Sequence, residues 1–532
     1  MAVYTMGEVK IEGKYQVHEK LELKMNIGVN RHGYLTFGGL VSEEQAMEYP
    51  KQNADKEVVS VSLRGEVEFC GYPHEITVAY QNNHYYLRVK LITSSKLMDT
   101  KPYDRFFQEQ GQTPKEILKE AYEDSGIGNL IAIRGNTEIK RPILQYRITD
   151  WLFTLLIAGK LGTVVIPDAT LAEPWVSLGV PKREAIDETN NSSYLVGRNA
   201  EEFRRKNSTE FSYGNAQNVI ESLLCDRYNQ YGHYEGNHRN TVYDRLGYQN
   251  FLYYKMRSDN RYKLGDSVSV DGKVLTVMQK TFEYERGEIV EHYILGHEQE
   301  FAVQFHYNKM ITGLELEGKV LERSGQEIKL LLDIDAGRPK SGKTWFSYSP
   351  VTNNGMYSMP LVDEKVMLQW QSEADGDALV VRPYRKNIQD MPHPEQRHFQ
   401  TDCENHLQML PGLIEFVNPV GSVKWLKSVG FDISTNEYLS INAGEDVNIK
   451  SGGKVQVFSA ERLTVCKAGV ESSIDMIGDD IHIKAVDDVH EDSKIDDYES
   501  VTMPERAPDI KIDIETVSKL AAAVPRASSA KK

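Results

Sequence analysis

The sequence predicts a mainly β protein that ends in an intertwined β-helix made by three copies of the chain. Three observations predict this fold class: an eight-residue repeat over residues 423–470, alternating apolar and polar residues through most of the upstream chain, and few helical patterns. In each of the six repeats the first and third residues are apolar and the residue between them is polar. These apolar residues are the predicted core of the β-helix: Val423, Trp425, Phe431, Ile433, Leu439, Ile441, Val447, Ile449, Val455, Val457, Leu463 and Val465.

The repeat also predicts the number of chains. Apolar residues two positions apart lie on one face of a strand, and the Gly, Ser, Asn and Asp that fill the rest of each repeat suit turns. A strict period of this kind is typical of stacked short strands. One repeat buries two side chains, whereas a full coil of a single-chain β-helix needs roughly 20 residues or more. Three chains that each supply one side therefore predict a homotrimeric prism; an antiparallel sheet with coincidental spacing is the alternative.

The upstream chain changes pattern several times. Residues 1–98 alternate as half-buried strands do. Residues 113–125 predict an amphipathic helix with Thr113 as its N-cap. Residues 149–161 predict a second helix, and strand patterns return over residues 188–300.

A small barrel is predicted next. Five short strands with glycine-containing turns over residues 309–388 favour a Greek-key barrel such as an OB-fold, and another small barrel of similar size is the alternative. The predicted organisation is a first β-barrel (1–100), an α/β helical insert (101–187), a second β-barrel (188–304), an OB-fold (305–390), a connector (391–422), the β-helix (423–492) and a partly flexible tail (493–532).

Composition limits the classes of function. The formal charge of −16 argues against a protein that binds the nucleic-acid backbone. No apolar run reaches the roughly 20 residues of a membrane span, and the N-terminus lacks the apolar core of a Sec signal peptide. Four cysteines far apart in sequence are typical of reduced thiols. We therefore expect a protein made in the bacterial cytoplasm.

Local motifs then resemble those of one family. A glycine in a strand, a Ser-rich turn and an aspartate occur at Gly71, Ser94, Ser95 and Asp99. A second motif is carried by Gln145, Tyr146, Thr149, Asp150 and Trp151, and a third by Trp345, Gly355, Pro360 and Glu364. In this order the three motifs resemble those of the VgrG-like spike proteins of contractile injection systems and of the fused hub and spike of myovirus baseplates. In that family the second is the hub motif and the third is the OB motif, and Asp363 stands where the family has a glycine.

The resemblance implies a mechanical function. In that family the two barrels form the hub, a trimeric ring that caps the inner tube; the OB-folds form a collar, and the β-helix is a needle that pierces the target membrane. The implied partners are two further copies, the inner tube protein, baseplate proteins and a PAAR-like tip protein or effector cargo, with transient membrane contact and no nucleic acid. The protein would be assembled in the baseplate and ejected into or through the target envelope. The resemblance does not separate a type VI system, an extracellular injection particle, a tailocin and a phage.

An enzyme is not expected. The sequence has no HExxH, GxSxG or P-loop motif. The alternative is a trimeric β-helical phage tailspike that binds or cleaves surface glycans, for which the many carboxylates could supply a catalytic pair.

No cofactor is expected, although two metal sites are conceivable. His393, His398, Cys403 and His406 are residue types that bind zinc, but their spacings match no zinc module, and a surface connector is the alternative. An apical metal ion on the threefold axis, through His482 or His490, is the second possibility.

Overall fold

The computed structural model is mainly β, as predicted, and contains two compact units, Met1–Ser434 and Thr435–Lys532. Each unit is described by itself. No helix among the described residues is long and apolar enough to cross a membrane. The structure describes residues 4–52, 56–109, 111–134, 138, 141–188, 193–198, 251–258, 260–303, 307–335, 342–350, 358–383, 395, 397–400, 404–466 and 472–486.

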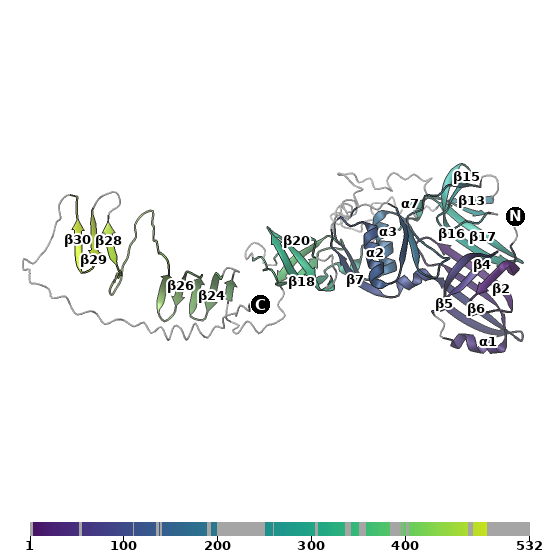
Figure 1. Ribbon diagram of the computed structural model, residues 1–532, viewed down its shortest axis with the longest axis horizontal. Coiled ribbons are helices and arrows are strands. Elements are labelled where there is room, and N and C mark those ends of the chain that lie inside the picture. Colours follow the sequence, from purple (N-terminus) through teal and green to yellow (C-terminus); the bar gives the residue numbers. More distant parts are fainter. Residues whose placement is uncertain are drawn as a thin grey trace, which may run out of the picture. The chain divides into compact units, whose positions relative to one another are not determined.

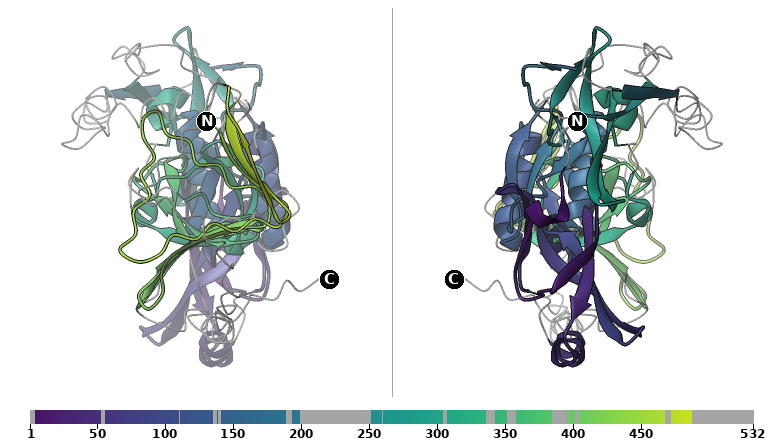
Figure 2. Two further views of the ribbon diagram at one scale, coloured as in Figure 1. Left: turned by 90° about the vertical axis from the view of Figure 1, so that its left-hand side faces the viewer. Right: turned by 90° about the vertical axis from the view of Figure 1, so that its right-hand side faces the viewer.

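The largest element is a 12-stranded sheet that joins the two predicted barrels (Figure 1). β2 from the first segment pairs with β16 from the second, from Gly28↔Gln279 to Lys24↔Glu283, and one hydrophobic core runs through both. Figure 2, right, shows the purple and teal strands side by side. In order, the sheet contains β1 (Val9–Glu12), β4 (Val59–Leu63), β5 (Glu66–Gln81), β6 (His84–Thr93), β3 (Tyr34–Val41), β2 (Glu19–Gly28), β16 (Lys273–Glu285), β17 (Glu288–Gly296), β14 (Leu252–Arg257) and β13 (Ser193–Arg198), with β15 (Ser267–Val270) and β12 (Ile186–Asp187) off this path.

Tight turns set the register of the long hairpins. Asn82 and Asn83 join β5 to β6 with φ of 52° and 63°, and Arg286 and Gly287 join β16 to β17 with φ of 51° and 93°. Two left-handed residues make a turn whose twist matches that of the flanking strands. The helices that flank or follow these strands are short: α1 (Glu43–Glu48), α7 (Glu298–Phe301), and the 3-10 turns η1 (Met6–Glu8), η2 (Tyr49–Lys51) and η3 (Ser94–Asp99).

The helical insert begins and ends where its capping residues predict. α2 (Pro114–Ser125) starts with a Thr113/Glu116 capping box and ends at Gly126 with φ of 67°. α3 (Asp150–Leu161) starts at the N-cap Thr149 and ends at Gly162 with φ of 66°. The left-handed conformation at both glycines terminates the helices at low cost. The strands of the insert are β7 (Pro102–Phe107), β8 (Asn129–Ile133), β9 (Ile143–Thr149), β10 (Val165–Pro167) and β11 (Trp175–Leu178).

A five-stranded barrel follows, which we call the collar barrel. Its antiparallel sheet has the order β20-β19-β18-β21-β22, and a bridge between Tyr348 and Val380 links its two edges. The five predicted strands are therefore present, while the OB-fold assignment itself stays a prediction. The elements are η6 (Lys309–Ile311), β18 (Glu315–Ser324), β19 (Glu327–Leu332), η7 (Asp333–Asp335), β20 (Trp345–Ser347), β21 (Lys365–Trp370) and β22 (Ala378–Pro383).

The predicted connector contains strands. A second five-stranded antiparallel sheet has the order β23-β24-β25-β26-β27, and most of it precedes the repeat. Sequence analysis missed these strands because their His, Gln and Pro content hides the alternation. The elements are β23 (Arg397–Gln400), β24 (His406–Leu410), β25 (Leu413–Val417), β26 (Gly421–Leu426) and β27 (Gly430–Thr435).

The single chain does not form the predicted β-helix. Residues 436–461 carry no helix or strand, and β28 (Arg462–Cys466), β29 (Ser473–Ile477) and β30 (Asp480–Lys484) form a three-stranded antiparallel sheet. One chain can supply only one side of a three-chain prism. The β-helix therefore remains a prediction about the assembly.

Candidate functional site

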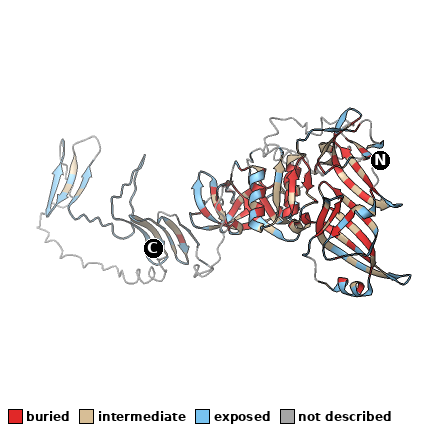
Figure 3. Cartoon of the chain, turned by 45° about the vertical axis from the view of Figure 1, so that its right-hand side comes forward, coloured by how far each residue is buried: buried red, intermediate tan, exposed pale blue. Residues whose placement is uncertain are grey.

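Most apolar residues of the repeat are exposed to solvent. Figure 3 shows how far each part of the chain is buried. Ile449 is 78% exposed, Ile441 70% and Phe431 66%. Burying a side chain of this kind stabilises a structure by about 1.5–3 kcal/mol, so a row of them in water favours association. Ten of the predicted core residues are exposed, namely Trp425, Phe431, Ile433, Leu439, Ile441, Val447, Ile449, Val455, Val457 and Val465, and Val423 and Leu463 are half-buried.

The sheet of β23 to β26 extends this apolar surface upstream. Its register places Met409, Ile414 and Trp425 in one row across β24, β25 and β26. Leu407, Phe416 and Val423 form the next row on the same face. The first repeat therefore continues an apolar sheet face that begins before residue 423.

The opposite face of that sheet is mixed: Gln408, Glu415 and Lys424 form one row, and Leu410, Leu413 and Leu426 form the next. Glu415 lies 3.8 Å from His406 Nε2 and 3.7 Å from Lys424 Nζ, which places one carboxylate between two basic side chains on neighbouring strands. Opposite charges across antiparallel strands stabilise the pairing modestly. The two faces differ in exposure, since Met409, Phe416 and Trp425 on the first face are 42%, 56% and 64% exposed.

A buried joint connects the helical insert to the collar barrel. Lys160 of α3 lies 2.5 Å from Asp375, and both side chains are at most 2% exposed. Asp375 also accepts a hydrogen bond from the Leu144 backbone N–H at 3.3 Å. Asp335, after β19, accepts from the Phe106 N–H at 3.2 Å and from Gln108 Nε2 at 2.7 Å.

Apolar packing reinforces this joint. Phe106 and Leu144 belong to the same hydrophobic cluster as the core of the collar barrel. The Phe106 ring meets Trp370 edge-on with the centroids 5.5 Å apart, and it stacks on Phe346 at 6.1 Å. The insert and the barrel therefore contribute to one hydrophobic core within the first unit.

The structure brings the predicted hub-motif residues together around a buried arginine. Arg105 donates from Nη1 to Gln145 Oε1 at 2.9 Å and also pairs with Asp150. Gln145 Nε2 donates to the same Asp150 carboxylate at 2.9 Å, and Arg105 Nε donates to Asp124 at 2.7 Å. A buried charge is tolerated when it is paired and hydrogen-bonded in this way. The motif therefore anchors the start of α3.

The remaining hub-motif residues contact the first barrel and the collar barrel. Thr149 caps α3 and donates to Asp99 Oδ1 at 2.6 Å, while the Trp151 ring lies 4.4 Å from that of His32. Burial lowers the pKa of His32, with Asp99 acting in the opposite direction. Tyr146 packs against the collar-barrel core, and its carbonyl accepts from Asn308 Nδ2 at 2.8 Å.

The predicted OB-motif residues shape a turn rather than a reactive site. Glu364 accepts a hydrogen bond from the Leu361 N–H at 2.9 Å, Pro360 is buried, and Lys329 lies over the Trp345 ring at 4.5 Å. Asp363 has a φ of 73°, a conformation that glycine adopts without strain. Gly355 lies outside the described residues.

The predicted metal ligands are only partly described. His393, Cys403 and His490 lie outside the described residues, as do residues 493–532. His398 belongs to β23, His406 lies beside Glu415, and His482 belongs to β30. Within the part of the chain that the structure describes, no cluster of three or more His, Cys, Asp or Glu could hold a metal ion.

Sequence reasoning missed the charged residues of the joint and of the hub network. Lys160 is the lone charge in the apolar segment LLIAGKLG, while Arg105 follows Asp104 in YDRFF and directly precedes two phenylalanines. A charge in such a place is a signal for a buried partner, but its partner is distant: Asp375 follows Lys160 by 215 positions. The sequence could have identified the charged residues but not their pairing.

Comparison with known proteins finds matches only among solved structures. No protein family and no curated protein matches the sequence. The E. coli c3393 protein, a type VI secretion component described as similar to the T4 tail proteins gp27 and gp5, is 10% identical over 71% of this chain and 99% of its own, with a TM-score of 0.45.

Two further solved structures match this chain over part of its length. A chain of the Francisella PdpA–VgrG complex is 9% identical over 81% of this chain and 80% of its own, with a TM-score of 0.49. The 43 kDa tail protein of the Shewanella oneidensis prophage MuSo2 is 10% identical over 56% of this chain and 98% of its own, with a TM-score of 0.40.

Proposed function

We propose that this protein is the non-enzymatic hub and spike of a contractile injection system, in which three copies cap the inner tube and form a membrane-piercing needle. The observation that carries the proposal is that ten of the twelve apolar repeat residues are exposed to water in the single chain. Three copies would bury these residues against one another at one axis. Closed strand pairing along that axis also removes sheet edges and resists local unfolding.

The joint between the insert and the collar barrel supports a mechanical role. A needle transmits force only if its base does not bend, and a shared core with the buried Lys160–Asp375 pair gives the base that property. Interiors packed in this way deform little under load. The proposed path of force runs from the hub through the insert and the collar barrel into the needle.

The cargo is proposed from the sequence alone. Residues 493–532 lie beyond the repeat, and the segment DIKIDIETVSKL alternates as one strand that could add to a sheet of a tip protein or effector. In this proposal the needle carries a PAAR-like tip or an effector on its distal end.

The oligomeric state of the purified full chain tests the proposal. Size-exclusion chromatography with light scattering should give three times the 60.6 kDa chain mass, independent of dilution. A stable monomer would exclude the spike. Electron microscopy of the assembled particle after sheath contraction should then place the protein at the leading end of the tube, and a location elsewhere would exclude the piercing role.

A further inference from the structure

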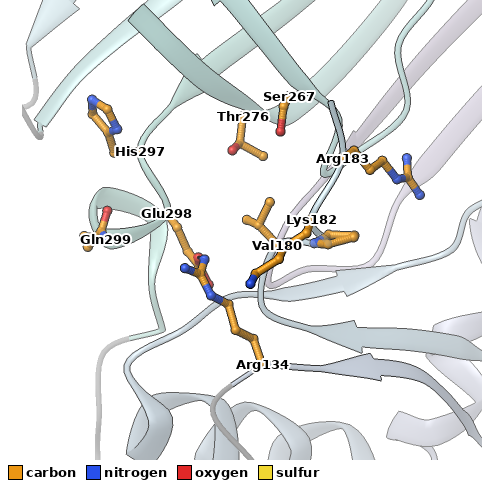
Figure 4. Close-up of a pocket in the computed structure, with 10 residues that line it drawn as sticks. Arg134, Val180, Lys182, Arg183, Ser267, Thr276, His297, Glu298 and Gln299 are labelled. Atoms are coloured by element: carbon orange, nitrogen blue, oxygen red, sulfur yellow. The ribbon is translucent and has the colours of Figure 1, made fainter. Parts of the chain in front are cut away.

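A cavity of about 320 Å³ lies outside the joint and the repeat, in the first unit (Figure 4). It lies between the loop at residues 180–183, the β15–β16 hairpin and α7. Its lining contains three cations, Arg134, Lys182 and Arg183, and one carboxylate, Glu298. The lining therefore has an excess of positive charge, whereas the whole chain has a formal charge of −16.

Side-chain contacts hold one wall of the cavity, where Arg134 is 59% exposed and Glu298 is 12% exposed. Arg134 Nη1 lies 2.6 Å from Glu298 Oε2, and the Thr163 hydroxyl donates to the other oxygen of the same carboxylate. Gly179, with φ of 84°, leaves room for this cluster: a Cβ there would lie 2.6 Å from Arg134 Cβ. The glycine and the two polar partners therefore hold the arginine beside the cavity.

The loop that carries Lys182 is anchored on both sides of that residue. Pro181 packs against Gly265, where a Cβ would lie 3.1 Å from Pro181 Cδ, and Arg183 forms an ion pair with Asp266. Asp266 is itself held, because it accepts from the Lys263 N–H at 2.7 Å. Lys182 is exposed, and within the described residues its ammonium group has no ion pair.

The opposite wall supplies hydroxyl groups. Ser267 and Thr276 are register partners on β15 and β16, and Figure 4 shows them across the cavity from Arg134 and Glu298, with Arg183 pointing away. Burial, together with the nearby Lys273, lowers the pKa of His297, so its ring is neutral at neutral pH. The cavity therefore offers an ammonium, a guanidinium and two hydroxyls to a ligand.

We propose that this cavity binds a glutamate or aspartate side chain from an acidic loop of a partner protein. Arg134 pairs with Glu298 and Arg183 pairs with Asp266, so the positive charge of Lys182 is the one that these two carboxylates do not neutralise. Arg134 keeps guanidinium donors beyond the one that it gives to Glu298, and the hydroxyls can complete the carboxylate's hydrogen bonds. This docking site is separate from the needle and does not depend on trimer formation.

A labelled peptide tests the site on the full-length protein. The probe is an end-blocked, rhodamine-labelled hexapeptide with two central glutamates, and fluorescence anisotropy measures its Kd at low salt. We expect Lys182→Gln to weaken binding about tenfold, as the loss of one charge-assisted hydrogen bond does. Ser267→Glu should abolish binding by placing a carboxylate in the cavity, while Lys182→Arg and the exposed control Lys343→Gln should bind as the wild type does.

Four results would overturn the proposal. The first two are that a peptide with glutamines in place of the glutamates binds equally well, or that Lys182→Gln binds the peptide as the wild type does. The other two are that equimolar sulfate displaces the peptide fully, or that Lys182→Gln changes the oligomeric mass. The sulfate result would mark a general small-anion site, and the mass result a contact between copies. Because the peptide binds one chain, these outcomes are distinct from a failure of the trimer prediction.

Discussion

The hub and collar region, residues 4–383, and the repeat, residues 423–465, treat their apolar side chains in opposite ways. Trp370 and Phe153 are fully buried in the first region, whereas Trp425 and Ile449 in the second are 64% and 78% exposed. The first region closes its cores within one chain. The second has the apolar pattern of a core, but its apolar side chains are exposed in the single chain, which is what the proposed assembly of three copies would change.

Charges show the same difference. Lys280 of the shared sheet is 3% exposed, its Nζ lies 2.5 Å from Glu68 and 3.5 Å from Glu291, and burial lowers its pKa. In the repeat the described charged residues are exposed, apart from the half-buried Lys424. A chain that satisfies its buried charges by itself folds independently of concentration, while one that needs partners does not.

The largest expected effect is the loss of the trimer in Ile449→Asp. Three copies of the substitution would place three carboxylates near one axis without partners, which costs far more than the burial of isoleucine gains. Light scattering should show the chain mass fall from three copies to one. The hub should keep its own unfolding transition, because its cores do not include residue 449.

A neighbouring residue gives the matched control. Asn448→Asp adds the same charge one position earlier, on the face that the repeat directs outward. We expect this variant to remain a trimer. Trimers of both variants would show that the predicted inward register is wrong.

Local rules explain which parts of the fold were predictable. The capping residues Thr113 and Thr149 and the glycines that follow the helices set both helices of the insert, and all of these signals lie within a few residues. The pairing of β2 with β16 joins strands about 250 residues apart, and no local pattern specifies it. The sequence therefore predicted individual helices and strands well, but not which distant strands pair with each other.

The next largest effect concerns the buried Arg105–Asp150 pair of the hub and collar region. Arg105→Met removes the partner of Asp150 and leaves that carboxylate buried, so we expect the free energy of unfolding to fall by about 3–5 kcal/mol. Chemical denaturation at two protein concentrations measures it. The loss should be the same at both concentrations, and the oligomeric mass should not change.

A surface ion pair is the control for Arg105. Arg88, 55% exposed, pairs with Glu22, and Arg88→Met should cost under about 1 kcal/mol. Similar losses in both variants would mean that the buried network contributes nothing beyond an ordinary surface pair.

The candidate site was predictable to different extents in the two regions. The twelve repeat residues could be identified because their period is exact and local. The joint could not, since Asp335 and Asp375 are two of many acidic residues and acquire their roles only when the collar barrel folds against β7 and β9.

A smaller effect concerns the start of α3. Thr149→Ala removes the N-cap hydrogen bond to the Leu152 N–H and the contact with Asp99, and should cost about 1 kcal/mol. Thermal unfolding measures this loss in the hub transition. Thr149→Ser keeps the hydroxyl and should recover most of the stability, whereas equal losses in both variants would assign the effect to the methyl group.

The smallest expected effect is a dependence of the stability of the hub on pH, through the buried His32. Burial holds the pKa of His32 below its ordinary 6.5, while Asp99 opposes that shift and Lys96 adds to it. His32 therefore binds a proton near pH 6.5 in the unfolded chain but only at lower pH in the folded hub. The free energy of unfolding consequently falls as the pH drops through 6.5. The contribution of Asp99, whose pKa is also lowered, stays constant until the pH falls below about 4, because its ordinary value is 3.8.

His32→Gln tests this titration. Between about pH 7.5 and pH 5.5 the hub transition of the wild type should move to lower temperature, and the variant should move less, because it has lost one titrating group. His292 and His297, whose pKa values are also lowered by burial, retain part of the slope. The exposed His84→Gln should behave as the wild type. An unchanged slope in His32→Gln would mean that the first region accepts a proton at this histidine without cost, and the contrast between that region and the repeat would then rest on apolar burial alone.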